Sequence, residues 1–292
     1  MTSPPPGHTN WPDVTDWRRD AGFRWPERVP WSQLAPSFHV TFGRADPADP
    51  QPEHIEGIGQ NGTGKTHVFG KIYQERAFVT GRPSVILAHK PLDGTLAKIG
   101  FPIVHTWDAL TRNVRDGKVN NIYMPLTKLT GAPRHAWYDD RLTDVLDRMW
   151  AGAAPDRPAD TDVILDDAGF IEEELPQTFG RLKMYLREGR APGFSVGLLK
   201  QRPQGGTRLA TSETQWTLGF RPKDDSDLER WSELFGARRD WMPVFRSLNR
   251  ERREFVIKHT VSQDAYISWV DEPLAPREPP RRRRPLRDWL RG

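Results

Sequence analysis

One short stretch of this 292-residue chain decides its fold, Gly59-Gln60-Asn61-Gly62-Thr63-Gly64-Lys65-Thr66. It matches the pattern G-x-x-x-x-G-K-[ST], it follows the run His54-Ile-Glu-Gly-Ile58, and a helix-compatible run comes next. In such a strand, loop and helix, the glycines let backbone N–H groups turn inward around a phosphate, and the helix N-terminus adds its partial positive charge. The stretch therefore predicts a P-loop that holds the phosphates of a nucleotide.

The chemistry of nucleotide binding gives the side chains of this loop separate roles. We expect the loop from Gly59 to Thr66, with the adjacent His67, to bind ATP, and Lys65 to reach its β- and γ-phosphate oxygens. The hydroxyl of Thr66 would coordinate Mg²⁺. The alternative is a glycine-rich turn that merely caps a helix.

A second stretch, Asp162-Val-Ile-Leu-Asp166-Asp167, ends a short apolar run with two carboxylates. An open α/β sheet presents its ligand site at this end of its strands. Asp166 would hold Mg²⁺ through the water shell of the ion, and Asp167 would orient or deprotonate the water that attacks the γ-phosphate. Two acids after a strand can also cap the next helix. Together with the P-loop, they favour ATP hydrolysis.

The pattern of apolar runs predicts the fold class. From residue 54 onward, short apolar runs alternate with helix-like segments, which is typical of a parallel sheet covered on both faces. We expect an α/β fold with a mostly parallel sheet, which together with the P-loop resembles the P-loop NTPases of RecA/ASCE-like type. The predicted strands are 54–58, 84–89, 102–105, 162–166, 194–199, 216–220, 254–258 and 265–270, and the predicted helices are 65–77, 92–98, 138–151, 174–189 and 224–235.

Proline, tryptophan and arginine divide the chain into three parts. Residues 1–52 form an irregular arm rich in tryptophan and proline, with one strand over 37–42 and a proline-broken linker over 46–52. We expect the indoles of this arm to dock on the core of the chain itself. The ATPase domain spans 53–271, and 272–292 form a basic, disordered tail.

Composition and charge exclude several classes of site. The chain has no cysteine, which excludes disulfides and thiolate chemistry, and its eight histidines lack metal-ligand spacing, so no zinc site is expected. No run approaches the roughly 20 apolar residues of a membrane span, so we expect no direct span. A cytoplasmic location is compatible with these features.

The net charge of +4 comes from the tail. Residues 273–292 carry seven arginines against two carboxylates, and the rest of the chain is close to neutral. Such a tail would grip the phosphates of DNA without reading bases, dock an acidic partner, or remain a solvated end.

Four stretches resemble the FtsK/HerA superfamily of DNA-translocating and DNA-packaging ATPases. They are the P-loop with its strand, the strand Ser84-Val-Ile-Leu-Ala-His-Lys90, the strand ending in the two aspartates, and Arg190-Ala-Pro-Gly193-Phe-Ser-Val-Gly-Leu-Leu-Lys-Gln201-Arg202-Pro203. The last is the most specific, because a helix ends near Arg and Gly, a strand follows, and Gln-Arg-Pro closes it. The chain departs from the family in two places. The family's second strand usually ends in Asp-x-Lys, whereas this chain has Ala88-His89-Lys90, and the family's acidic pair is more often Asp-Glu, whereas this chain has Asp-Asp.

The resemblance implies further residue roles. Gln201 corresponds to the glutamine that senses the γ-phosphate between the acid-bearing strands, although a glutamine there can also merely cap a strand. In the family an arginine from the neighbouring subunit of a ring completes the site, and Arg190 and Arg187 are the candidates. Either arginine can instead interact favourably with the partial negative charge at a helix C-terminus. The shorter Asp167 makes slow or assembly-dependent hydrolysis unsurprising.

The resemblance also implies a function and partners. It implies a homo-oligomeric ring, for example a hexamer, that moves double-stranded DNA in genome packaging or DNA transfer. A viral portal, a capsid or a membrane complex would be its partner, and a packaging ATPase would be virion-associated. The alternative is a nucleotide-dependent switch or assembly ATPase that acts on a protein. A kinase is disfavoured, because no acceptor-binding lid is recognisable between the strands.

Overall fold

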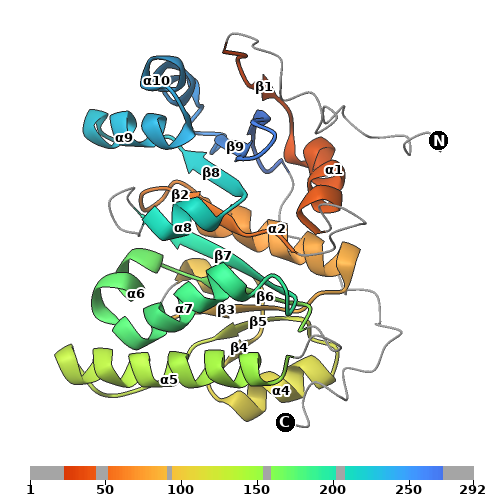
Figure 1. Cartoon of the computed structure of the whole chain (residues 1–292), viewed down its shortest axis with the longest axis vertical. Coiled ribbons are helices and arrows are strands. Elements are labelled where there is room, and N and C mark those ends of the chain that lie inside the picture. The colour runs from red at the N-terminus through yellow and green to blue at the C-terminus, as the bar shows by residue number, and fades with distance from the viewer. Residues whose placement is uncertain (1–22, 44–51, 91–93, 154–158, 202–207, 272–292) are drawn as a thin grey trace.

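The computed structural model describes residues 23–43, 52–90, 94–153, 159–201 and 208–271 (Figure 1). The basic tail predicted over 272–292 lies outside these residues, as does most of the predicted linker. Within the described part of the chain, no helix is both long enough and apolar enough to cross a membrane.

One ten-stranded sheet runs through the molecule, in the order β1-β10-β9-β8-β2-β7-β6-β3-β5-β4 (Figure 1). Its neighbouring strands are parallel, except that β9 is antiparallel to β8 and to β10. The strands are β1 (Glu27–Arg28), β2 (Ile55–Ile58), β3 (Ser84–Leu87), β4 (Ile103–Val104), β5 (Asn120–Tyr123), β6 (Thr161–Leu165), β7 (Phe194–Lys200), β8 (Trp216–Phe220), β9 (Phe255–His259) and β10 (Ala265–Ser268). The predicted α/β class with a mostly parallel sheet is confirmed.

Helices cover both faces of this sheet and bury three apolar clusters. The helices are α1 (Trp31–Gly43), α2 (Lys65–Thr80), α3 (Gly94–Ala97), α4 (Trp107–Arg115), α5 (Gly131–Ala151), α6 (Ala168–Glu174), α7 (Pro176–Glu188), α8 (Arg208–Glu213), α9 (Asp225–Phe235) and α10 (Arg238–Ser247). The first cluster joins α1 and α2 to one face, the second joins α5 and α7 to the other, and the third lies under α9 and α10. The sheet is therefore buried on both sides, as its apolar strands require.

Close packing of α2 on the sheet depends on two glycines. A Cβ atom on Gly197 of β7 would collide with the hydroxyl of Tyr73, and one on Gly57 of β2 would collide with the ring of Phe69. The rings of α2 therefore rest directly on the backbone of β2 and β7. This contact fixes the helix that follows the P-loop against the two central strands.

The strand predicted over 37–42 is wrong, because these residues belong to α1. The six-residue alternation lies inside a longer helical pattern, in which Trp31, Leu34, Ala35 and Phe38 recur at the spacing of one helix face and are all buried. The indole Nε1 of Trp31 donates to Glu75 Oε2 of α2 at 2.7 Å. This indole of the arm is thus docked on the core, as expected, and α1 and β1 share the core and the sheet of the rest of the described chain.

All eight strands predicted from residue 54 onward are present, but β1 and β5 were not expected. The strand β5 begins with two asparagines, which usually mark turns. In the fold Asn121 is fully buried, and its amide donates to Lys118 O at 2.6 Å and accepts from Asn113 at 2.9 Å. Tertiary partners therefore offset the local preference. Helices α4, α6, α8 and α10 were also missed, and the helix predicted over 174–189 corresponds to α7.

Candidate nucleotide-binding site

The P-loop connects β2 to α2 as the motif predicts. Gly62 and Gly64 have φ angles of 84° and 96°, in the left-handed region that favours glycine. The hydroxyl of Thr63 donates to Gln60 O at 2.8 Å and closes the turn. Directly after Gly64, the chain enters α2 at Lys65. The loop therefore wraps around the N-terminus of a 16-residue helix, where a bound phosphate would be stabilised.

A cavity of about 240 Å³, called here the phosphate cavity, opens above this loop. It brings together most of the predicted site residues from three parts of the sequence: the P-loop after β2, the acidic pair after β6, and Gln201 after β7. Its lining residues are Asn61, Gly62, Gly64, Lys65, Thr66, His67, Lys90, Lys98, Asp166, Asp167, Gln201 and Arg253. The carboxyl ends of parallel strands meet at one sheet edge, which explains why these distant segments converge.

The second aspartate of the acidic pair, Asp167, accepts hydrogen bonds from one carboxamide and one ammonium group. Gln201 Nε2 donates to Asp167 Oδ2 at 2.7 Å, and Lys90 Nζ donates to the same oxygen at 2.5 Å. Lys90 follows β3, Asp167 follows β6 and Gln201 follows β7, and these three strands are neighbours in the sheet. The arrangement gives the edge of the phosphate cavity one carboxylate, one amide and one ammonium group within direct contact.

The backbone of Asp167 is in the left-handed region, with φ 66° and ψ 61°. This conformation costs most residues roughly 1–2 kcal/mol, and aspartate and asparagine tolerate it best. Glutamate, with its longer side chain, is less suited to it. The backbone geometry therefore gives a physical reason for the Asp-Asp pair in this chain.

Asp166 and Thr66 supply the oxygen atoms that fit a magnesium ion. Both line the phosphate cavity, and Asp166 is buried with 6% of its surface exposed. One carboxylate and one hydroxyl beside a nucleotide are the ligands that Mg²⁺ takes at triphosphate sites, with water and phosphate oxygens completing the shell. The donor set therefore fits the predicted Mg²⁺.

The sequence analysis missed two cations of this cavity, Lys98 and Arg253. Arg253 lies in the turn before β9, and within the described residues no carboxylate pairs with its guanidinium. With Lys65 and Lys90, these cations outnumber the two carboxylates of the cavity. Burial, helped by the charges of Arg253 and Lys71, lowers the pKa of His67 below its usual value. The cavity is thus positively charged, as a polyphosphate site needs to be.

Four predicted site residues do not line the cavity: Gly59, Gln60, Thr63 and Arg190. The amide of Gln60 turns toward α9, where Nε2 donates to Asp227 Oδ2 at 2.6 Å. Arg190 precedes β7 and therefore lies at the opposite, amino-terminal edge of the sheet, where its Nε donates to Pro52 O at 3.0 Å. Arg187 is exposed near the end of α7. Neither arginine lies at the cavity of its own chain.

A buried ion pair lies directly beneath the site. Lys200 Nζ of β7 lies 2.6 Å from Glu56 Oε2 of β2, and the two side chains are 2% and 0% exposed. The hydroxyls of Thr211 and Thr217 lie 3.5 and 3.3 Å from the same carboxylate. Because β2 leads into the P-loop and Lys200 directly precedes Gln201, this pair links the two strands whose ends form the site.

No protein-family profile matches this chain, and no curated protein sequence matches it. Solved structures do match its fold. B204, the DNA-packaging ATPase of Sulfolobus turreted icosahedral virus, has a TM-score of 0.54 at 15% identity, over 75% of this chain and 98% of B204. The B204 genome-packaging NTPase of Sulfolobus turreted icosahedral virus 2 in complex with ATP-gammaS has a TM-score of 0.52 at 13% identity, over 76% and 98%.

A third structure of the same fold comes from a secretion system. The cytoplasmic domain of the type VII secretion ATPase EccC of Thermomonospora curvata has a TM-score of 0.53 at 15% identity, over 79% of this chain and 27% of EccC. At these identities the likeness establishes the fold, while the activity has to be argued from the site. The predicted resemblance to ATPases of the FtsK/HerA type is confirmed at the level of the fold.

Proposed function

We propose that this chain, which has the fold of the FtsK/HerA-type ATPases, is an ATP-hydrolysing motor that moves double-stranded DNA in genome packaging or DNA transfer. The observation that carries the proposal is the position of Asp167. Its carboxylate contacts both Gln201 and Lys90 at the edge of the cavity that the P-loop lysine lines. A P-loop alone would support binding, whereas this cluster also supports hydrolysis.

Each group has a defined task in hydrolysis. The backbone of the P-loop and Lys65 bind the β- and γ-phosphates, and Asp167 accepts a proton from the attacking water or orients it. The amide of Gln201 can donate to the γ-phosphate and accept from water at once. Mg²⁺, bound by Thr66 and through water by Asp166, would neutralise charge on the phosphates.

The size of the packaging enzymes favours a DNA motor. B204 is matched over 98% of its length, so the fold shared with this chain amounts to a complete packaging ATPase. EccC is matched over only 27% of its chain, and it is described as a secretion ATPase. That likeness supports a second candidate, a nucleotide-dependent switch or assembly ATPase that acts on a protein.

Stimulation by DNA separates the two candidates. We expect ATP turnover by the full chain to rise when duplex DNA is added, and the rise to disappear as salt increases, because phosphate contacts release counterions. Lys65→Ala should abolish turnover with and without DNA while circular dichroism shows an intact fold. Turnover that ignores DNA at low salt would refute the motor and favour the protein-directed ATPase. Full turnover in the Lys65→Ala variant would refute the ATPase itself.

We also propose a homo-oligomeric ring in which Arg190, or Arg187, reaches the nucleotide of the neighbouring subunit. Mixing two inactive variants tests this. A subunit with Arg190→Ala keeps its P-loop, and a subunit with Lys65→Ala keeps its arginine, so a mixed ring contains complete sites. Partial recovery of turnover on mixing supports an arginine in trans. If mixing restores no turnover with either the Arg190→Ala or the Arg187→Ala variant, the arginine in trans is refuted. A chain that remains a monomer by mass at every concentration of ATP analogue and DNA would refute the ring.

A further inference from the structure

A second cavity of about 410 Å³ adjoins the phosphate cavity. The two share three lining residues: Gly64, His67 and Arg253. The other residues of the second cavity are Val68, Glu251, Arg252, Trp269, Val270 and Asp271. Its volume is within the range of about 300–1,000 Å³ that is common for small-molecule sites.

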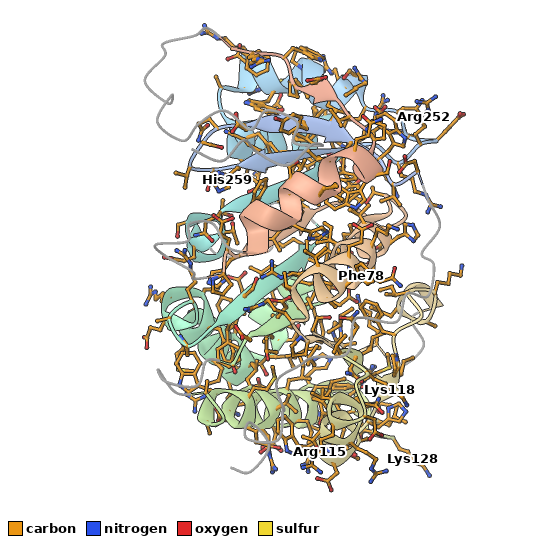
Figure 2. All side chains as sticks on the ribbon, turned by 90° about the vertical axis from the view of Figure 1, so that its right-hand side faces the viewer. Phe78, Arg115, Lys118, Lys128, Arg252 and His259 are labelled. Carbon is orange, nitrogen blue, oxygen red and sulfur yellow. The ribbon has the colours of Figure 1, made fainter. Side chains whose placement is uncertain are left out.

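The second cavity lies on the far side of the P-loop from the hydrolytic groups. Asp167 and Gln201 follow β6 and β7, on one side of β2, whereas Arg253 and Trp269 flank β9 and β10, on the other side. Because β9 is antiparallel to β8, the turn before β9 lies at the same sheet edge as the P-loop. Figure 2 shows Arg252, just before β9, and His259, at its end, at opposite edges of the molecule.

This position is where the nucleoside end of a bound nucleotide belongs. The γ-phosphate has to reach Asp167, so the phosphate chain runs through the P-loop away from β6 and β7. Its other end therefore leaves the P-loop beside His67 and Arg253, the residues that both cavities share.

The lining of the second cavity suits an aromatic base. Trp269 is only partly buried, and the guanidinium of Arg252 lies 5.6 Å from the centre of its ring. Indole faces and guanidinium planes are the surfaces on which bases stack. Asp271 adds a carboxylate whose Oδ2 accepts from Ser32 Oγ at 2.7 Å, which fixes a hydrogen-bond acceptor at the rim.

A neighbouring cavity serves as a comparison. It lies against Gly62 and Thr63 and is lined otherwise by Arg221, Lys223, Arg250, Arg253 and Glu254. It contains no aromatic side chain among the described residues. A stacked base would therefore find a platform in the second cavity and none in this one.

We propose that the second cavity binds the ribose and base of the nucleotide whose phosphates occupy the P-loop. The base stacks on Trp269, and Arg253 lies where the two cavities meet, beside the α-phosphate. The inference rests on the proposed binding of ATP. It assigns nucleoside recognition to the segment around β9 and β10, which carries no nucleotide-binding motif. The ligand class is a nucleoside triphosphate with a planar aromatic base.

Calorimetric titration with two ligands tests the assignment. MgATP has a base, and inorganic tripolyphosphate with Mg²⁺ has only the phosphates. Trp269→Ala should weaken MgATP binding by about 5- to 150-fold, the usual loss for one stacked base, and leave tripolyphosphate binding unchanged. Trp269→Phe should restore most of the affinity. Trp25→Ala is the matched control, because Trp25 is 45% exposed and lies outside the cavity.

The outcomes separate this inference from the proposed function. If Lys65→Ala weakens both ligands but Trp269→Ala weakens neither, ATP binding stands and the base site is refuted. Equal losses for both ligands in Trp269→Ala would also refute it. If Lys65→Ala weakens neither ligand, the proposed function fails first.

Photo-crosslinking of the unmodified chain does not depend on how the variants fold. Irradiation with 8-azido-ATP should label residues 251–271, as read by mass spectrometry of peptides. Labelling confined to the segment 221–225 would overturn the assignment.

Discussion

The buried pair of Glu56 and Lys200 gives the sharpest test of how the site is held. Lys200→Met removes the cation, keeps a similar volume, and leaves the Glu56 carboxylate buried at 0% exposure. Breaking a buried ion pair costs about 3–5 kcal/mol, because the remaining charge is uncompensated. The hydroxyls of Thr211 and Thr217 stay near the carboxylate, so we expect the lower end, about 3 kcal/mol.

Denaturation followed by circular dichroism measures this cost. A loss of about 3 kcal/mol corresponds to a fall in Tm of roughly 6–12 °C for a domain near this size. The double variant Glu56→Gln/Lys200→Met should recover at least about 1.5 kcal/mol relative to the sum of the single losses, because the two sites are coupled. Lys128→Met is the control, since Lys128 is exposed (Figure 2) and surface changes stay within about 0.5 kcal/mol.

Two results would refute the reasoning about this pair. One is a Lys200→Met variant within about 1 kcal/mol of the wild type, since breaking a buried pair costs more than that. The other is a double variant whose loss equals the sum of the single losses. Because Lys200 directly precedes Gln201, we also expect the folded Lys200→Met protein to hydrolyse ATP more slowly.

Three further predictions test other parts of the structure. Asp167→Asn keeps the shape of the side chain but removes its charge, so turnover should fall about 10²- to 10⁴-fold while calorimetry still detects bound ATP; turnover near the wild-type rate would contradict the assigned role. Gly197→Ala would push a Cβ into a ring of α2 and should cost about 1–3 kcal/mol in urea denaturation, whereas Gly180→Ala, with open space around its Cβ in α7, should gain about 0.5–1 kcal/mol. Burial lowers the pKa of His54 to about 3, so the unfolded chain takes up a proton below about pH 6.5 that the folded chain does not, and the free energy of unfolding should fall by up to about 1.4 kcal/mol per pH unit toward pH 4. His54→Gln should flatten that slope, and an unchanged slope would contradict the assignment.

Local sequence was sufficient to predict the P-loop and the acidic pair of the phosphate cavity. The P-loop and the acidic pair are short, contiguous patterns whose geometry follows from strand, turn and helix, and the structure brings them together in one cavity. Gln201 was found only through its resemblance to a family signature, because a single glutamine after a strand has no chemical pattern of its own. Its contact with Asp167 depends on β6 and β7 being neighbours, which is a property of the sheet order.

The remaining residues could not be predicted, because tertiary packing places them. Arg253 and Trp269 reach the site only because β9 and β10 extend the sheet beyond β8. The helix α1 was misread because a six-residue window can alternate by chance, while its buried face extends over Trp31 to Phe38. The strand β5 was hidden by Asn120 and Asn121, whose turn preference is overruled by buried hydrogen bonds.

The contacts of Asp167 with Lys90 and Gln201 affect how tightly this site would bind a triphosphate. In this structure Gln201 and Lys90, the two donors suited to a γ-phosphate, are both occupied by one carboxylate oxygen. An arriving triphosphate therefore competes with an internal anion. Each charged hydrogen bond it displaces is worth about 1.5–3 kcal/mol, so each lowers the apparent affinity roughly 10- to 150-fold unless the ligand replaces it in full. Diphosphate lacks the oxygens to do so, and the carboxylate would recapture both donors after hydrolysis. We therefore expect Asp167 to act as an intramolecular competitor of the γ-phosphate and so to affect triphosphate and diphosphate binding differently.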